Sequence, residues 1–163
     1  MTLARAICNV QVCVSKIAQA HPWVPFRWQL SQVFSVAPGT PLPTSTDEHE
    51  WAQTEVTLFE DEVDGYYLNC TAPHPAWFVH YRLDEELGQE ARPDIRFVTL
   101  SYNEAGRILD AGETVENLPT DDATARWLAD FAQQHFKSEP RKRRRPASFV
   151  TPADRINTGS SGE

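Results

Sequence analysis

The chain has 163 residues, of which 40% are hydrophobic and 23% charged, and its formal net charge is -8 at pH 7. This length suits a single domain, and this composition excludes a globally disordered chain. Apolar runs are far shorter than the roughly 18 residues that a membrane-spanning helix needs, so no membrane span is expected. The first residues lack the continuous apolar stretch of a secretory signal, and the three cysteines are unclustered. We therefore expect a cytoplasmic protein without a disulfide framework.

Charge is divided unevenly along the chain. Residues 1–136 hold eight Lys/Arg against 20 Asp/Glu, a net of -12, whereas residues 137–163 hold seven against three, a net of +4. An acidic body repels the phosphates of a nucleic acid and attracts a basic protein surface. We expect one globular domain over residues 1–137 and a basic, flexible tail over residues 138–163. The tail contains an unbroken basic run: Arg141, Lys142, Arg143, Arg144 and Arg145.

Alternating apolar and polar residues predict strands over residues 7–17, 26–36 and 51–59, because side chains of a strand point to opposite faces in turn. Residues 37–47 contain three prolines and no periodicity, which predicts a loop. Along the second strand, the large apolar side chains are expected to share one face: Phe26, Trp28, Leu30, Phe34 and Val36.

The second half of the chain mixes strands and helices. Residues 60–71 fit both helical and strand spacing, and the acidic residues at their start favour a short helix. Alternation predicts strands over residues 77–83 and 95–100, and one more short strand over residues 113–118.

Two helix starts are marked by capping residues. Ser101 and Glu104 match a capping box, which predicts a helix to about Asp110 with Gly112 as its left-handed stop. Thr120 or Asp121 caps a last helix that ends near Lys137. This helix carries an apolar stripe: Trp127, Leu128, Phe131, His135 and Phe136.

These elements predict an α+β fold with about five strands in a mostly antiparallel sheet and two or three helices. The C-terminal amphipathic helix is expected to pack its stripe on the sheet. Burial of each large apolar side chain there contributes roughly 1.5–3 kcal/mol.

No strong catalytic motif is present. The chain lacks a P-loop, a G-x-G-x-x-G turn, a G-x-S-x-G elbow and H-E-x-x-H. Cys70 and His74 have the spacing of one pair of zinc ligands, which Cys8 or Cys13 could join, but a second closely spaced pair is missing, so we expect no metal and no cofactor. A nucleophilic pair of Cys13 or Cys70 with His80 or His135 is disfavoured, because an acidic surface raises a thiol pKa.

The other charged and aromatic residues of interest are typical of solvated or partner-binding surfaces rather than of catalytic sites. The carboxylates at Asp47–Glu50 and Glu60–Asp64 do not match a calcium-binding loop and predict a solvated acidic face. Trp23 and Trp51 are candidates either for anchoring a protein interface or for covering the ends of the core. The basic run Arg141–Arg145 has no interleaved aromatic residue for stacking on bases. A solvated or partner-docking tail is therefore favoured over a nucleic-acid site, and the run could also fold back on its own acidic domain.

Several motifs occur in an order and spacing that resemble the DUF3305 family of small bacterial proteins, over about residues 7–146. The N-terminal motifs are the strand Cys8-Asn9-Val10-Gln11-Val12-Cys13-Val14 before Pro22-Trp23, and Trp28-x-Leu30 before Pro38-Gly39. The central motif is Tyr67-Leu68-Asn69 before Trp77-Phe78-Val79. The C-terminal motifs are Glu104-Ala105, Leu109-Asp110-Ala111-Gly112-Glu113, and Trp127-Leu128-Ala129-x-Phe131 before Glu139-Pro140 and the Lys/Arg cluster.

The resemblance implies no established enzymatic activity. Members of the family are typically encoded beside subunits of molybdenum-dependent formate dehydrogenase and sulfur-carrier accessory genes. We therefore expect a non-catalytic accessory or assembly protein whose partner is a formate dehydrogenase subunit or its maturation factor. The alternative, implied by a molybdopterin-guanine dinucleotide label on some members, is a small enzyme or cofactor-binding protein. Its pocket would be lined by Trp28, Tyr81 and the histidines.

Overall fold

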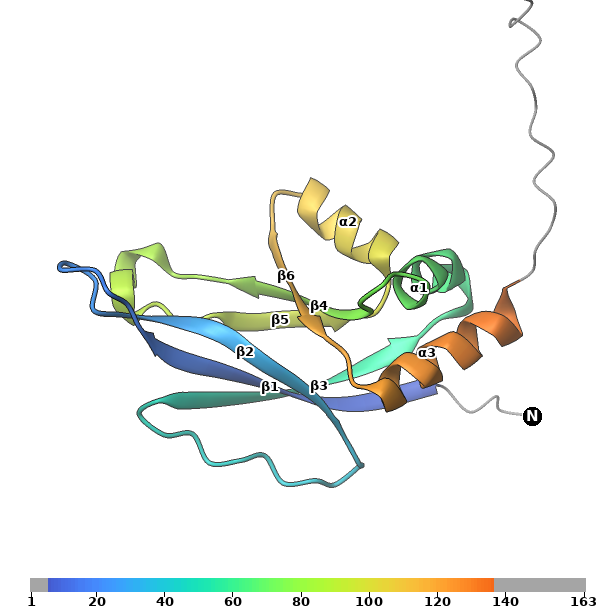
Figure 1. Ribbon diagram of the computed structural model, residues 1–163, viewed down its shortest axis with the longest axis horizontal. Coiled ribbons are helices and arrows are strands. Elements are labelled where there is room, and N and C mark those ends of the chain that lie inside the picture. The colour runs from blue at the N-terminus through green and yellow to red at the C-terminus, as the bar shows by residue number, and fades with distance from the viewer. Residues whose placement is uncertain (1–5, 137–163) are drawn as a thin grey trace, which may run out of the picture.

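The computed structural model describes residues 6–136, which form six strands, three α-helices and two short 3-10 segments (Figure 1). The strands are β1 (Ala6–Ala18), β2 (Phe26–Val36), β3 (His49–Leu58), β4 (Ala76–Arg82), β5 (Asp94–Thr99) and β6 (Thr114–Pro119). The helices are α1 (Val63–Cys70), α2 (Tyr102–Asp110) and α3 (Asp122–His135), and the 3-10 segments are η1 (Glu60–Glu62) and η2 (Glu85–Glu90). The expected tail over residues 138–163, with its basic run Arg141–Arg145, lies outside the described residues.

The α+β class is confirmed, but the prediction of one sheet of about five strands is wrong. The described strands form two three-stranded antiparallel sheets, with the orders β2-β1-β3 and β5-β4-β6. In each sheet the first strand in sequence is the central one. The segment η1–α1 carries the chain from the edge of the first sheet to the centre of the second (Figure 1). Alternation predicts where strands lie, but it does not say which strands pair.

One core lies between the two sheets. Alternate valines of β1, Val10 and Val12, are fully buried and belong to the same apolar cluster as Trp77 and Val79 of β4. Among the described residues, the indole N–H groups of Trp28 and Trp77 are buried without a hydrogen-bond partner. An unpaired buried donor costs about 1–3 kcal/mol, so the apolar burial of these rings has to exceed that cost.

A β-bulge in β2 changes which of its side chains face the core. Cys13 pairs with Gln32 and Val14 pairs with Leu30, so Ser31 is an extra residue. Beyond the bulge Val33 is buried, whereas Phe34 is 43% exposed on the outer face. The expectation that Phe34 and Val36 share a face with Trp28 and Leu30 is therefore wrong, because one inserted residue reverses the alternation.

The helix boundaries agree closely with the capping signals. The favoured short helix after the third strand is present as α1. The Ser101 hydroxyl accepts from the Glu104 N–H at 3.1 Å, and Gly112 has a φ of 83°. Asp121, not Thr120, caps α3, since its side chain accepts from the Thr124 N–H at 3.2 Å.

Helix α3 packs against both a helix and a sheet. Leu128 and Ala132 are buried in the core, while Phe131 packs edge-on against Tyr66 of α1 with ring centroids 5.7 Å apart. The Thr124 hydroxyl donates to that of Ser35 on β2 at 3.2 Å. Of the predicted stripe, Phe131 therefore packs on α1, and Trp127 borders a groove with the ends of β1 and β2. Over residues 6–136, no helix is long and apolar enough to cross a membrane.

The start of α2 is fixed by a close approach to α1. A Cβ atom on Gly65 would lie 2.1 Å from the Ser101 Oγ atom. That hydroxyl donates to Glu62 Oε2 at 2.6 Å, and Arg107 of α2 also pairs with Glu62. Glycine at position 65 therefore allows the contact on which the α2 cap depends.

We expect Gly65→Ala to lower the free energy of unfolding by about 1–3 kcal/mol, because the added methyl group has to displace Ser101. Gly106→Ala is the matched control. A Cβ atom there meets nothing within 4 Å, so this variant is expected to be neutral or to gain about 0.5–1 kcal/mol of helix stability. Urea unfolding followed by circular dichroism measures both. Equal stability of the two variants would contradict the close approach.

Candidate functional site

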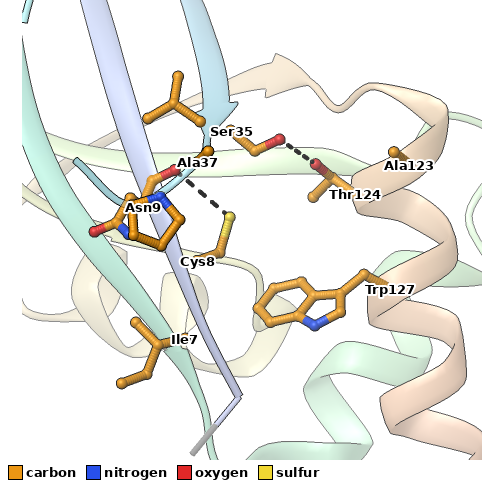
Figure 2. Close-up of a pocket in the computed structure, with 10 residues that line it drawn as sticks. Ile7, Cys8, Asn9, Ser35, Ala37, Ala123, Thr124 and Trp127 are labelled. Atoms are coloured by element: carbon orange, nitrogen blue, oxygen red, sulfur yellow. Dashed lines mark hydrogen bonds between the residues drawn. The ribbon is translucent and has the colours of Figure 1, made fainter. Parts of the chain in front are cut away.

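A groove of about 320 Å³ separates the N-terminal half of α3 from the ends of β1 and β2 (Figure 2). Cys8 of β1 and the indole of Trp127 of α3 lie next to each other on its walls (Figure 2). The Ser35–Thr124 hydrogen bond bridges the two sides. Small and apolar residues make up most of the lining: Ile7, Cys8, Asn9, Ser35, Val36, Ala37, Pro38, Ala123, Thr124 and Trp127.

The thiol in this groove is not activated. Burial, reinforced by the negative charge of Asp121, raises the pKa of the Cys8 thiol above its usual value. Its Sγ atom lies 3.7 Å from the Asn9 carbonyl oxygen, to which it can donate. Because the thiolate is the nucleophile of cysteine chemistry, a raised pKa makes Cys8 a poor one at neutral pH. The small and apolar residues that line most of the groove suit contact with an apolar group.

A hydroxyl–imidazole cluster lies on the outer face of the first sheet. The Ser15 Oγ atom lies 3.0 Å from His49 Nδ1 and 2.7 Å from the hydroxyl of Ser31, the bulge residue. Cys13 Sγ is 3.9 Å from the same imidazole nitrogen. Ser15 and His49 have the spacing of a nucleophile and its base, but Ser15 is only 5% exposed, which denies a substrate access to its hydroxyl. The cluster instead ties the start of β3 to β1.

His80 and His135, the two histidines weighed as partners for a cysteine, each lie beside a glutamate instead. His80 contacts Glu113 at 3.1 Å, and His135 lies 3.5 Å from Glu60. Cys13 meets His49 because β1 and β3 are antiparallel and Ser15 is paired with His49. That proximity depends on strand register, which no local signal in the sequence predicts.

The Cys70–His74 pair gains no further ligands in the structure. Cys70 Sγ donates to the Tyr67 carbonyl oxygen of its own helix at 3.5 Å, and burial raises the pKa of this thiol. Across residues 6–136, no group of three or more His, Cys, Asp or Glu side chains is placed to hold a metal ion.

Trp28 and Tyr81, the two aromatic residues expected to line a pocket, do so together. They border a pocket of about 330 Å³ between β2, η2 and β6, along with Arg27 and Glu116. Burial raises the pKa of Glu116 against the opposing effect of Arg27, and burial also raises that of Tyr81. Among the described residues that line this pocket, none is a histidine.

The two tryptophans considered as interface anchors differ in exposure. Trp23 is 85% exposed, in the connection between β1 and β2 that projects from the body (Figure 1). Trp51 is partly buried and stacks on Phe34 across the outer face of the first sheet, with ring centroids 6.2 Å apart. Trp23 is therefore the better placed of the two to insert into a partner.

The second sheet carries an ion network on its outer face. Glu113 accepts from Arg82 at 2.6 Å and lies 3.1 Å from the His80 imidazole. These hydrogen bonds lower the pKa of Glu113 to about 2, and the one from Arg82 has the larger effect. The network joins β4 to the turn that precedes β6.

A family model matches residues 9–145, which is most of the chain. The chain belongs to the DUF3305 family. Its description is a protein of unknown function, so the match confirms the resemblance without supplying an activity for DUF3305. No curated protein and no solved structure matches the chain.

We expect Glu113→Gln to destabilise the protein most above about pH 5 and less as the pH falls toward 2. In the folded protein the Glu113 carboxylate stays charged down to about pH 2. In the unfolded chain the same group takes up a proton near its ordinary pKa of 4.5. The stabilisation is therefore present at neutral pH and is lost in that acidic window. Thermal unfolding between pH 3 and pH 7 measures this stabilisation. Glu90→Gln is the control, because Glu90 is an exposed carboxylate at the end of η2. A deficit that does not change with pH would contradict the network.

Proposed function

We propose that this DUF3305 protein is a non-catalytic, chaperone-like accessory factor that binds a protein partner in the cytoplasm. The exposure of Trp23 carries the proposal. Leaving a tryptophan 85% exposed to water is unfavourable, and a tryptophan at a protruding tip is the kind of residue that dominates binding energy at protein interfaces. The unreactive groove beside α3 and the stacked Phe34–Trp51 pair on the first sheet add further contact surface.

The resemblance to proteins encoded beside molybdenum-dependent formate dehydrogenase supports the choice of partner. We propose a subunit of that enzyme or one of its maturation factors. The charge supports a basic contact surface on the partner, because residues 1–136 carry a net charge of -12. The basic run Arg141–Arg145 would supply a second contact to an acidic region of the same partner.

Affinity capture from the native host, with the full chain as bait, tests this proposal. We expect a formate dehydrogenase subunit or a cofactor-insertion protein among the captured proteins. Trp23→Ala should weaken that complex about thirtyfold or more, since loss of an anchor of this kind costs upward of about 2 kcal/mol.

Leu42→Ala is the matched control for this experiment. Leu42 is also an exposed apolar residue, at 43%, but it lies in the loop between β2 and β3. Its loss should leave the affinity unchanged. Capture of neither class of protein, or equal weakening by both variants, would refute the proposal.

The pocket at Trp28 and Tyr81 favours a second candidate, a small enzyme or cofactor-binding protein that handles molybdopterin-guanine dinucleotide. Arg27 in that pocket offers a charge for a phosphate, although Glu116 opposes it. If this candidate is right, calorimetry with guanosine diphosphate should detect binding tighter than about 1 mM, and Tyr81→Ala should weaken it at least fivefold. An absence of heat at millimolar nucleotide would eliminate the candidate.

A further inference from the structure

Helix α1 has one buried face and one exposed apolar face. Val63, Tyr66 and Asn69 are buried, whereas Tyr67 and Leu68 are 44% and 47% exposed. Phe136, at the end of α3, is 38% exposed and stacks on Tyr67. We refer to Tyr67, Leu68 and Phe136 as the α1 patch. Exposed apolar groups that gather in this way mark a site of interaction.

The end of α3 is held against this patch by two contacts. The rings of Phe136 and Tyr67 stack with centroids 4.8 Å apart and an interplanar angle of 20°. The neighbouring His135 places its Nδ1 atom 3.5 Å from Glu60 Oε1. Figure 1 shows the C-terminal end of α3 beside α1. Residue 137 and those that follow therefore start from the α1 patch itself.

Carboxylates border the patch at the turn that leads into α1. Glu60 and Asp61 are both exposed, and Glu60 is the residue that His135 approaches. The segment that follows α3 has the complementary character, with seven Lys/Arg against three Asp/Glu over residues 137–163. Its basic run Arg141–Arg145 is followed by the apolar pair Phe149-Val150. One segment thus offers basic side chains opposite the carboxylates and apolar side chains that could cover the patch.

The residues between α3 and the basic run are long enough for the run to contact α1 of the same chain. Arg141 is five positions after Phe136 in the chain, and five extended residues span about 17 Å. The eight residues of α1 span about 12 Å. The basic run can therefore reach either end of α1 without strain.

We propose that residues 137–150 dock on the α1 patch of their own chain. The basic run faces Glu60 and Asp61, and Phe149-Val150 covers Tyr67 and Leu68. In this arrangement the segment covers the patch in the free protein. A partner that binds the basic run then has to displace the segment from the patch. The inference does not rest on the proposed function, because it requires no partner protein.

Lysine cross-linking in the full chain tests this docking. The chain has lysines only at positions 16, 137 and 142, so Lys142 reports on the basic run alone. A zero-length carbodiimide joins an amine to a carboxylate where the two groups touch. We expect mass spectrometry to find Lys142 joined to Glu60 or Asp61 within single chains. A mixture of normal and ¹⁵N-labelled protein distinguishes links within a chain from links between chains.

Two variants separate the charged from the apolar half of the contact. Changing the four arginines of the run to Gln keeps Lys142 as the reporter and should lower the yield at least fivefold. Leu68→Ser should lower it about threefold. Its matched control is Leu109→Ser, because Leu109 is 52% exposed on α2 and should not affect the yield.

Three outcomes would overturn the proposal. Links from Lys142 that fall equally on Asp47 and Glu48, in the distant loop before β3, would mean an undirected contact. Links found only between differently labelled chains would identify a second copy as the occupant. Absence of any link from Lys142 would mean that the segment does not dock.

Discussion

A sheet of three strands with one apolar face is stable in water only when another layer covers that face. This constraint governs the whole molecule, because it consists of two such sheets that share one core. Val10 and Val12 of β1 and Trp77 and Val79 of β4 are all fully buried within it. Each sheet buries its apolar face against the other sheet, so we expect the two sheets to unfold together. The helices are secondary to this arrangement: α1 joins the layers, and α3 occupies the end where they diverge (Figure 1).

Polar interactions hold loops and turns against the outer faces of both sheets. On the first sheet, Gln11 is buried and its amide donates to the carbonyl oxygens of Thr40 and Pro41 in the long loop after β2, at 3.4 and 3.1 Å. The hydroxyl–imidazole cluster around Ser15 fastens the other end of that loop. On the second sheet, the ion network of Glu113 holds the turn before β6. These outer networks fix loops, and the Phe34–Trp51 stack remains beside them as an apolar surface on the first sheet.

Local patterns in the sequence predicted the strands and helix caps well, because alternation and capping act over a few neighbouring residues. The Ser101 cap and the left-handed Gly112 are examples. The bulge at Ser31 could not be predicted in the same way, since it is visible only against the partner strand. The meeting of Ser15 with His49 depends equally on register. Trp28 and Tyr81 were correctly grouped at one pocket, but the histidines expected beside them lie elsewhere.

The five tryptophans occupy very different surroundings, which has an optical consequence. Trp77 is fully buried in the core, where its indole N–H has no partner among the described residues, whereas Trp23 is almost fully exposed. Indole emits at shorter wavelength in a dry apolar site than in a solvated one, so the two rings should contribute at opposite edges of the intrinsic emission band. The blue edge then monitors the integrity of the interior, and the red edge monitors engagement of the projecting tip. The protein thus carries its own pair of fluorescent reporters, readable in one spectrum without any added dye.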